Sequence, residues 1–405
     1  MESIITKCSS LTELDLSHNS LGAEGAEFLC SVLPLLPNLT SLSIGSKETC
    51  VTVVEKLSEA LLQAKAIQCL NLSGHVISDS AAHVMTRILP TLRSLNLSHC
   101  EWSAAGGLQL LKALGESVRL EGLCLDSVQL NEESQVCLAH ALRNIKSIRS
   151  LKLNKTATAT GPSQENEVLH LLAATEGLTL MEEIELNGWR MADRGIEQLS
   201  RFLPAWTELR KISLSKNLIS DQSGDQLLEA LNRCSHLEEL HLSSNSLGDL
   251  TAARMALVLP SLTHITVLDI AENKIGEEGS VNLAKAVTCL KNLTKLQLTS
   301  VGTSELCDVA ASLAHCPLIQ DVGLGWNNCG DKVAEELARV MPLCQKLTRI
   351  DLESNTVSVF GAEALVRALQ SCPALQLIRL WRNKVPISVA KRLSQRDRRL
   401  NFSST

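Results

Sequence analysis

The chain has 405 residues and a net charge of −6. This mildly acidic balance leaves no broad basic surface for the phosphates of a nucleic acid. Aromatic residues make up 2% of the chain and tyrosine is absent, so we expect no base-stacking platform and no direct nucleic-acid binding.

The N-terminal residues, MESIITKCSS, contain no apolar signal core. Further along the chain, no apolar run approaches the roughly 18 residues of a membrane span. We therefore expect a cytoplasmic chain without a membrane partner.

A sequence repeat begins at Leu11 and continues almost to the C-terminus. Its pattern is L-x-x-L-x-L-x-x-N-x-L, and one clear copy runs from Leu237 through Asn245 to Leu247. Ten of the thirteen spacings are 28 residues, and the others are 25, 33 and 26. This period and consensus are those of the leucine-rich repeat. The expected repeats start near residues 11, 39, 67, 92, 120, 148, 181, 209, 237, 265, 293, 319, 347 and 375.

Each repeat predicts one strand and one helix. The L-x-L core alternates apolar and polar residues, which is typical of a strand with one buried face. Behind it, apolar residues recur at steps of four, as on the buried face of a helix. Strands stack about 4.8 Å apart, whereas helices need about 10 Å. We therefore predict an α/β solenoid of about 14 repeats over residues 1–405, curved into a horseshoe with parallel strands on its concave face and helices on its convex face, with a C-terminal cap at 386–405.

The asparagine at the ninth place of the repeat is expected to bond backbone groups in the bend that follows the strand. Repeats two to seven replace it with Lys47, His75, Cys100, Val128, Thr156 and Trp189. We therefore expect the N-terminal half to open more easily than the array from Leu209 onward. Polar residues such as Ser220 and Asp221 precede the helices, as capping residues do.

Fourteen cysteines are spread along the chain without a C-x-x-C pair. Five of them lie three residues before a repeat start, at Cys8, Cys234, Cys316, Cys344 and Cys372. This periodicity indicates reduced, buried structural thiols in place of a disulfide framework.

Three irregular segments leave alternatives open. Residues 154–166 contain an insertion, which is either a tolerated surface loop or a regulatory loop. The basic run Lys391–Arg399 is either a solvated capping helix or a patch for nuclear import or an acidic partner. The first residues, Lys7–Leu11, resemble Arg233–Leu237 at the end of a repeat. We therefore expect a C-terminal fragment or short product of a longer protein.

No motif for catalysis or cofactor binding occurs in the chain. The Walker A pattern, G-x-G-x-x-G, H-E-x-x-H and G-x-S-x-G are all absent. The ten histidines are scattered, with no metal-ligand spacing. We therefore expect no enzyme, no catalytic residue, no metal, no cofactor and no small-molecule substrate.

The remaining candidate surface is the open face of the strands, which we expect to bind other proteins. Most of its residues are small or polar, but tryptophan and arginine, which dominate interface hot spots, gather near the C-terminal end. Alternatively, these rings pack on neighbouring repeats or on arginine stems. The candidate partner-binding residues are Trp326, Arg349, Arg379, Trp381 and Arg382.

The long repeat and its L-G-x-E-G helix entry, at Leu21–Gly25 and again in Ile275–Gly279, resemble the ribonuclease-inhibitor-like class. That class includes ribonuclease inhibitor, the Ran GTPase-activating protein and the C-terminal repeats of NOD-like receptors. The uniform asparagine-type repeats are most similar to those of NOD-like receptors. The ending, Leu375–Pro386 and then Arg399–Phe402, resembles a CARD-domain-containing member that activates MHC class I genes.

This resemblance implies a non-enzymatic interaction module in innate-immune regulation, in the cytoplasm and the nucleus. It also implies roles in MHC class I transcription and in NF-κB and interferon signalling. Two alternatives from other classes remain: a GTPase-activating protein of the Ran-activating type, and a free-standing scaffold similar to ribonuclease inhibitor.

Overall fold

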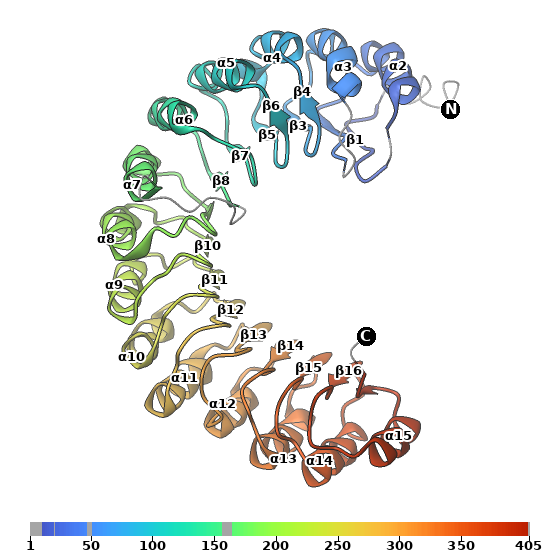
Figure 1. Cartoon of the computed structure of the whole chain (residues 1–405), viewed down its shortest axis with the longest axis vertical. Helices are drawn as coiled ribbons and strands as arrows, with labels where there is room; N and C mark the ends of the chain where they lie inside the picture. Colours follow the sequence, from blue (N-terminus) through green and yellow to red (C-terminus); the bar gives the residue numbers. More distant parts are fainter. Residues whose placement is uncertain (1–9, 20, 47–50, 156–163, 404–405) are drawn as a thin grey trace. The chain divides into compact units, whose positions relative to one another are not determined.

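The computed structural model describes residues 10–19, 21–46, 51–155 and 164–403. The chain divides into two compact units, unit 1 (Met1–Trp189) and unit 2 (Arg190–Thr405), which are described separately. In each unit, parallel strands lie on the inner side and helices on the outer side (Figure 1). The predicted α/β leucine-rich-repeat solenoid is therefore confirmed. The sequence positions Cys8, Lys47 and Thr156 lie outside the described residues.

Unit 1 contains one parallel sheet whose strands pair in chain order, together with a second pair of short strands, β4 and β6. Its strands are β1 (Glu13–Asp15), β2 (Ser41–Ser43), β3 (Cys69–Asn71), β4 (Val76–Ile77), β5 (Ser94–Asn96), β6 (Glu101–Trp102), β7 (Gly122–Cys124), β8 (Ser150–Lys152) and β9 (Glu183–Glu185). Its helices are α2 (Ala23–Val32), α3 (Val51–Gln63), α4 (Asp79–Met85), α5 (Ala104–Leu114), α6 (Glu132–Asn144) and α7 (Gln164–Thr175).

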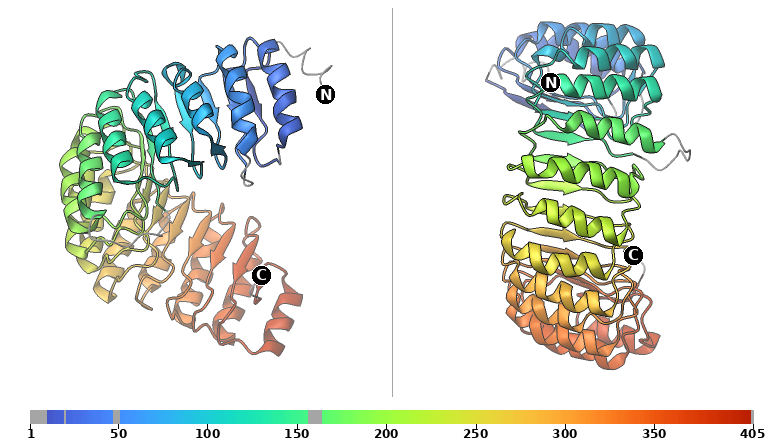
Figure 2. Two further views of the ribbon diagram at one scale, coloured as in Figure 1. Left: turned by 45° about the horizontal axis from the view of Figure 1, so that its top comes forward. Right: turned by 90° about the vertical axis from the view of Figure 1, so that its left-hand side faces the viewer.

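Unit 2 continues the same alternation, and its helices lie side by side along one surface (Figure 2). Its strands are β10 (Lys211–Ser213), β11 (Glu239–His241), β12 (Val267–Asp269), β13 (Lys295–Gln297), β14 (Asp321–Gly323), β15 (Arg349–Asp351), β16 (Leu377–Arg379) and β17 (Leu400–Asn401). Its helices are α8 (Ala192–Phe202), α9 (Asp221–Leu231), α10 (Asp249–Val258), α11 (Glu277–Cys289), α12 (Cys307–Ser312), α13 (Asp331–Val340), α14 (Val359–Leu369) and α15 (Ile387–Arg396).

The core is a stack of equivalent leucine and isoleucine positions. In the tenth repeat, Ile265, Leu268 and Ile270 are fully buried, as are Leu283 and Val287 of α11. Strand register places Leu268 beside its counterparts in the flanking strands β11 and β13. Each repeat therefore buries its apolar strand face and helix face against its two neighbours, which explains why a single repeat cannot fold alone.

The ninth-place asparagines form a buried hydrogen-bond ladder in unit 2. The side-chain Nδ2 of Asn245 donates to the carbonyl oxygens of Leu242, at 3.0 Å, and of Leu214 in the preceding repeat, at 3.1 Å. Its Oδ1 accepts from the N–H groups of Asn217 and Ile219, at 3.0 and 3.1 Å. One asparagine side chain thus forms hydrogen bonds with backbone groups in two repeats. These groups lie outside the strands and helices and have no partner there.

Unit 1 keeps part of this ladder with other donors. At the same place, His75 Nε2 lies 2.8 Å from the carbonyl oxygen of Ile44, and Trp189 Nε1 donates to that of Leu153 at 2.5 Å. The Cys100 thiol contacts the equivalent carbonyl at 3.1 Å. Among the described residues, each of these side chains bonds only the carbonyl of the preceding repeat. The Trp189 indole has no acceptor to replace the bonds that an asparagine accepts. Val128 has no polar side-chain atom for this role.

A second ladder links the helix starts of unit 2. Ser220 caps its own helix, α9, as predicted, because its hydroxyl accepts from the N–H of Ser223 at 3.2 Å. Asp221 instead caps the next helix: its carboxylate accepts from the N–H groups of Gly248 and Thr251, both at 2.8 Å. The capping aspartate of one repeat therefore fixes the helix start of the following repeat.

The C-terminal segment forms helix α15 and the short edge strand β17, which pairs with β16. Arg399 donates to the carbonyl oxygens of Leu369 and Cys372 at 3.0 and 2.9 Å, and it pairs with Asp397 at 2.7 Å. This guanidinium satisfies carbonyl groups at and just beyond the end of α14. One residue of the basic run is therefore structural.

Candidate functional site

Strand register brings two of the predicted site residues, Arg349 and Arg379, together with Asp351 on the open face of unit 2. Asp351 of β15 pairs in register with Gly323 of β14 and with Arg379 of β16. Arg349 lies two residues before Asp351 and therefore points to the same side of the strand. Gly323 is buried, because the Gln297 side chain of β13 lies over it and would collide with any Cβ at this position.

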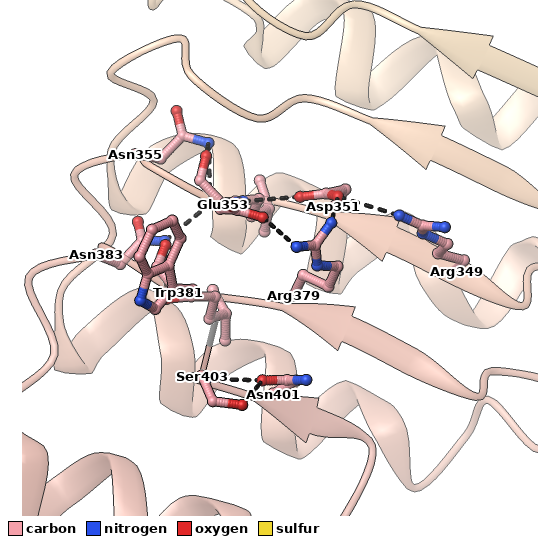
Figure 3. A network of polar contacts seen from close by, with 11 residues as sticks. Arg349, Asp351, Glu353, Asn355, Arg379, Trp381, Asn383, Asn401 and Ser403 are labelled. Atoms are coloured by element: carbon pink, nitrogen blue, oxygen red, sulfur yellow. Dashed lines mark hydrogen bonds and ion pairs between the residues drawn. The ribbon is translucent and has the colours of Figure 1, made fainter. Parts of the chain in front are cut away.

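Two carboxylates bind the arginines of this face (Figure 3). Arg379 lies 2.9 Å from the Asp351 carboxylate and 2.5 Å from the Glu353 carboxylate, and Arg349 lies 3.3 Å from Asp351. The Asp351 and Glu353 side chains are 15% and 13% exposed, whereas that of Arg349 is 44% exposed. Arg379 is therefore held by its neighbours, while Arg349 keeps donors available to solvent.

The two tryptophans and the third arginine form a stack beyond the strand ends. The Arg382 guanidinium carbon lies 5.0 Å from the ring centroid of Trp326 and 5.3 Å from that of Trp381. Both distances are within the roughly 6 Å range of a cation–π contact. We call Trp326, Trp381 and Arg382 the Trp-Arg stack. Its rings contact an arginine, as the alternative interpretation expected, but Trp326 is still 51% exposed.

The backbone gives no reason for a tryptophan at position 326. The place before the ladder asparagine has a positive φ, because its N–H must turn toward the next repeat, and Trp326 donates to the Glu353 carbonyl oxygen at 2.8 Å. A bulky residue is unfavourable in this region. The same place with positive φ is held by His18, Gly74, His99, Ser127, Gly188, Lys216, Ser244, Glu272, Ser300, Trp326, Ser354 and Arg382. The positive φ is therefore a feature of the repeat backbone, and what distinguishes position 326 is the bulk of its side chain.

A polar feature of the same face was not singled out from the sequence. His241 of β11 lies 3.1 Å from the Glu239 carboxylate and 3.8 Å from the Asp269 carboxylate. Burial lowers the pKa of His241, but hydrogen bonds and charge attraction from Asp269 and Glu239 outweigh it, so the pKa lies above its usual value. Strand register determines this cluster, whereas the sequence pattern predicts only that each side chain points away from the core.

The other tryptophans differ from the Trp-Arg stack. Trp206 is fully buried in the turn before β10. Trp189 replaces a ladder asparagine, and the Lys155 ammonium lies 3.8 Å from its ring centroid. Trp189 and Trp206 are thus core residues, and neither offers an exposed ring to a partner as Trp326 does.

The cysteines behave as buried structural residues wherever the structure describes them at repeat turns. Cys234, Cys316, Cys344 and Cys372 are buried and free. Burial raises the pKa of the Cys234 and Cys316 thiols to about 12 and that of Cys344 to about 11. These thiols are therefore protonated at neutral pH and poor nucleophiles. Across the described residues, no group of three or more histidine, cysteine, aspartate or glutamate side chains could hold a metal ion.

No helix in the described part of the chain is both long enough and apolar enough to cross a membrane.

Residues 7–30, 89–110, 233–250 and 261–284 match the family model described as Leucine Rich repeat. Over 338 residues, the chain is 55% identical to Protein NLRC5 of Ictalurus punctatus, a match that covers 82% of this chain and 19% of that protein. The chain is a leucine-rich-repeat array similar to that of NLRC5. The predicted resemblance to the repeats of NOD-like receptors is confirmed.

Two further comparisons agree with this result. NACHT, LRR and PYD domains-containing protein 14 of Mus musculus is 29% identical over 199 residues, covering 48% of this chain and 20% of that protein. A chain in the crystal structure of the Rad7 and Elc1 complex of yeast has a TM-score of 0.54 and 18% identity, covering 93% of this chain and 87% of its own length. That structure supports the fold alone. The chain spans about a fifth of the length of both sequence relatives.

Proposed function

We propose that this chain is the partner-binding module of an NLRC5-like receptor. It engages another protein through the open strand face of unit 2, centred on Trp326, Arg349, Arg379, Trp381 and Arg382. The observation that carries this proposal is the Trp-Arg stack, where a half-exposed tryptophan occupies a backbone position that disfavours it. The stack holds an aromatic anchor and an arginine in place before a partner arrives, which lowers the entropic cost of binding.

The proposed setting is innate-immune regulation, including MHC class I gene expression and NF-κB and interferon signalling. The similarity to NLRC5 supports this setting. We further propose that the module works without catalysis, in the cytoplasm and the nucleus.

The test is affinity capture from cytosolic and nuclear extracts with the wild-type chain and a Trp326→Ala/Trp381→Ala variant. Phe360→Ala is the matched control, because Phe360 is 75% exposed on α14, away from the strand face. We expect immune-signalling or promoter-bound proteins to be retained by the wild type and the control and lost from the double variant. If the double variant retained all partners, the binding site would lie elsewhere on the chain. Capture of a small GTPase whose hydrolysis the chain accelerates would favour the GTPase-activating alternative.

A further inference from the structure

The last repeat of unit 2 encloses a depression whose lining shares Arg382 with the strand-face site but none of its other four residues. Helix α15, strand β17 and the turn after β16 surround a volume of about 670 Å³. We call this depression the terminal cradle. Its walls are partly apolar, with contributions from Leu377, Val385, Ile387 and Phe402. Ile387 is 77% exposed, so an apolar side chain faces solvent at the rim with no described residue covering it.

The charge of the terminal cradle has one sign. Its lining includes Arg382, Lys391 and Arg398 and no aspartate or glutamate among the described residues. In the same segment, Arg392 pairs with Glu363, and Arg399 pairs with Asp397.

By contrast, Lys391 and Arg398 form no ion pair within the described ranges 10–19, 21–46, 51–155 and 164–403. Since the whole chain carries a charge of −6, this cationic lining is a local exception to its surroundings.

These features together favour one kind of ligand. Cations at the rim attract carboxylates, and the apolar wall loses contact with water only when apolar side chains cover it. A nucleic acid would match the charge but would leave Ile387 and Phe402 without apolar contacts. We propose that the terminal cradle binds an acidic segment of a partner protein that carries leucine or phenylalanine side chains between its carboxylates.

The experiment measures fluorescence anisotropy of a labelled peptide that alternates glutamate with leucine and phenylalanine, titrated with the full chain. We expect Lys391→Glu/Arg398→Glu to weaken binding about tenfold or more, because two attractive charges become repulsive. Arg396→Glu is the matched control, since Arg396 is exposed on the same helix but does not line the cradle. The control should change the affinity by less than about twofold.

A second pair of variants tests the apolar wall. Ile387→Ser should weaken peptide binding about threefold to tenfold, whereas Phe360→Ser, at a similarly exposed residue of α14, should not. Circular dichroism confirms that each variant is folded. The proposal is overturned if the wild type does not bind the peptide, or if the variants bind as the wild type does. It is also overturned if a serine-for-leucine peptide or a short single-stranded DNA binds equally well. Because no variant changes Trp326, Arg349, Arg379, Trp381 or Arg382, failure here would leave the strand-face proposal untouched.

Discussion

At the scale of single residues, Trp326 shows how folding and binding can place opposite demands on one position. The φ of Trp326 is 59°, where asparagine or glycine would be more favourable. Its ring is half exposed, so it buries less apolar surface than a core tryptophan such as Trp206 does. The role of Trp326 as a binding hot spot remains a prediction. Because of this geometry, a substitution at Trp326 should affect partner binding and stability to different extents.

Replacing Trp326 with asparagine should therefore reduce partner binding without a large loss of stability. The relief of a bulky residue at positive φ offsets the lost cation–π contact, which is worth about 0.5–1 kcal/mol at an exposed site. We expect a change of less than about 1 kcal/mol in the free energy of unfolding, measured with urea. Leu268→Ala, in the core, should cost about 2–5 kcal/mol in the same assay. A comparable loss for the tryptophan variant would indicate a structural role.

Asp221 makes stability depend on pH through the helix-start ladder. Partial burial raises its pKa, but hydrogen bonds from Thr251, Gly248 and Leu250 outweigh it, so the pKa in the folded chain lies below its ordinary value of 3.8. A carboxyl with a lowered folded pKa stabilises the fold above its ordinary pKa, and this contribution is lost as pH falls through the folded pKa.

Asp221→Ala should thus cost about 1–2 kcal/mol at neutral pH, because three N–H groups of the next helix start lose their acceptor. The difference between wild type and variant should shrink as the pH falls below 3.8. Thermal unfolding at several pH values measures this difference. Asp308→Ala is the control, since Asp308 lies in the first turn of α12 and is exposed. A difference that is the same at all pH values would contradict the capping role.

At the scale of elements, the sequence predicted the strand, the bend and the helix of each repeat well. The reason is that the pattern recurs along the chain. A residue at a given place of the consensus therefore has similar neighbours in each repeat that keeps the consensus. The asparagine side chain was predicted to form hydrogen bonds with backbone groups in the bend. In the structure, its hydrogen bonds also link two neighbouring repeats. The link from Asp221 to the next helix was not predicted, because it depends on how neighbouring repeats align in space. The same limit applies to the cluster around His241.

Asn245→Ala should show the strength of the asparagine ladder. The substitution removes the acceptor of the buried N–H groups of Asn217 and Ile219 and a donor to the Leu214 carbonyl oxygen. The Leu242 carbonyl oxygen still accepts from Asn273. We therefore expect a loss of about 2–4 kcal/mol in the free energy of unfolding. Asn19 is the matched comparison, since within the described part of the chain its side chain bonds only the carbonyl oxygens of Leu16 and Ser17 in its own repeat. Asn19→Ala should cost less than about 1 kcal/mol by the same measurement. Equal losses would show that the links between repeats contribute little.

For the whole molecule, the ladder distinguishes the two units. Unit 2 keeps buried asparagines at Asn217, Asn245, Asn273, Asn327 and Asn355, whereas unit 1 relies on donors such as His75 and Trp189. Stability in a repeat array is the sum of each repeat and its interfaces. We therefore still expect the N-terminal part to open first.

Native-state hydrogen exchange measures this difference directly. Amides of β5 and β7 in unit 1 should exchange at least about tenfold faster than those of β11 and β12 in unit 2, because local opening there costs less free energy. Uniform protection along the chain would contradict the prediction.

The function of the whole molecule was harder to predict from the sequence than its repeats or its fold. Composition and repeats excluded broad classes of chemistry, and the resemblance narrowed the family. The partner could not be named, because the side chains that select a partner occupy places that the repeat pattern leaves variable. The site residues could be proposed only because tryptophan and arginine stand out on a face of small and polar residues.

We propose that a partner protein binds the strand face of unit 2 at the Trp-Arg stack. Hydrogen exchange with and without the captured partner tests it most directly. We expect new protection in residues 321–326, 349–354 and 377–383 and little change in helices α9 to α14. Protection confined to the helices, with none at Trp326, Trp381 and Arg382, would contradict it.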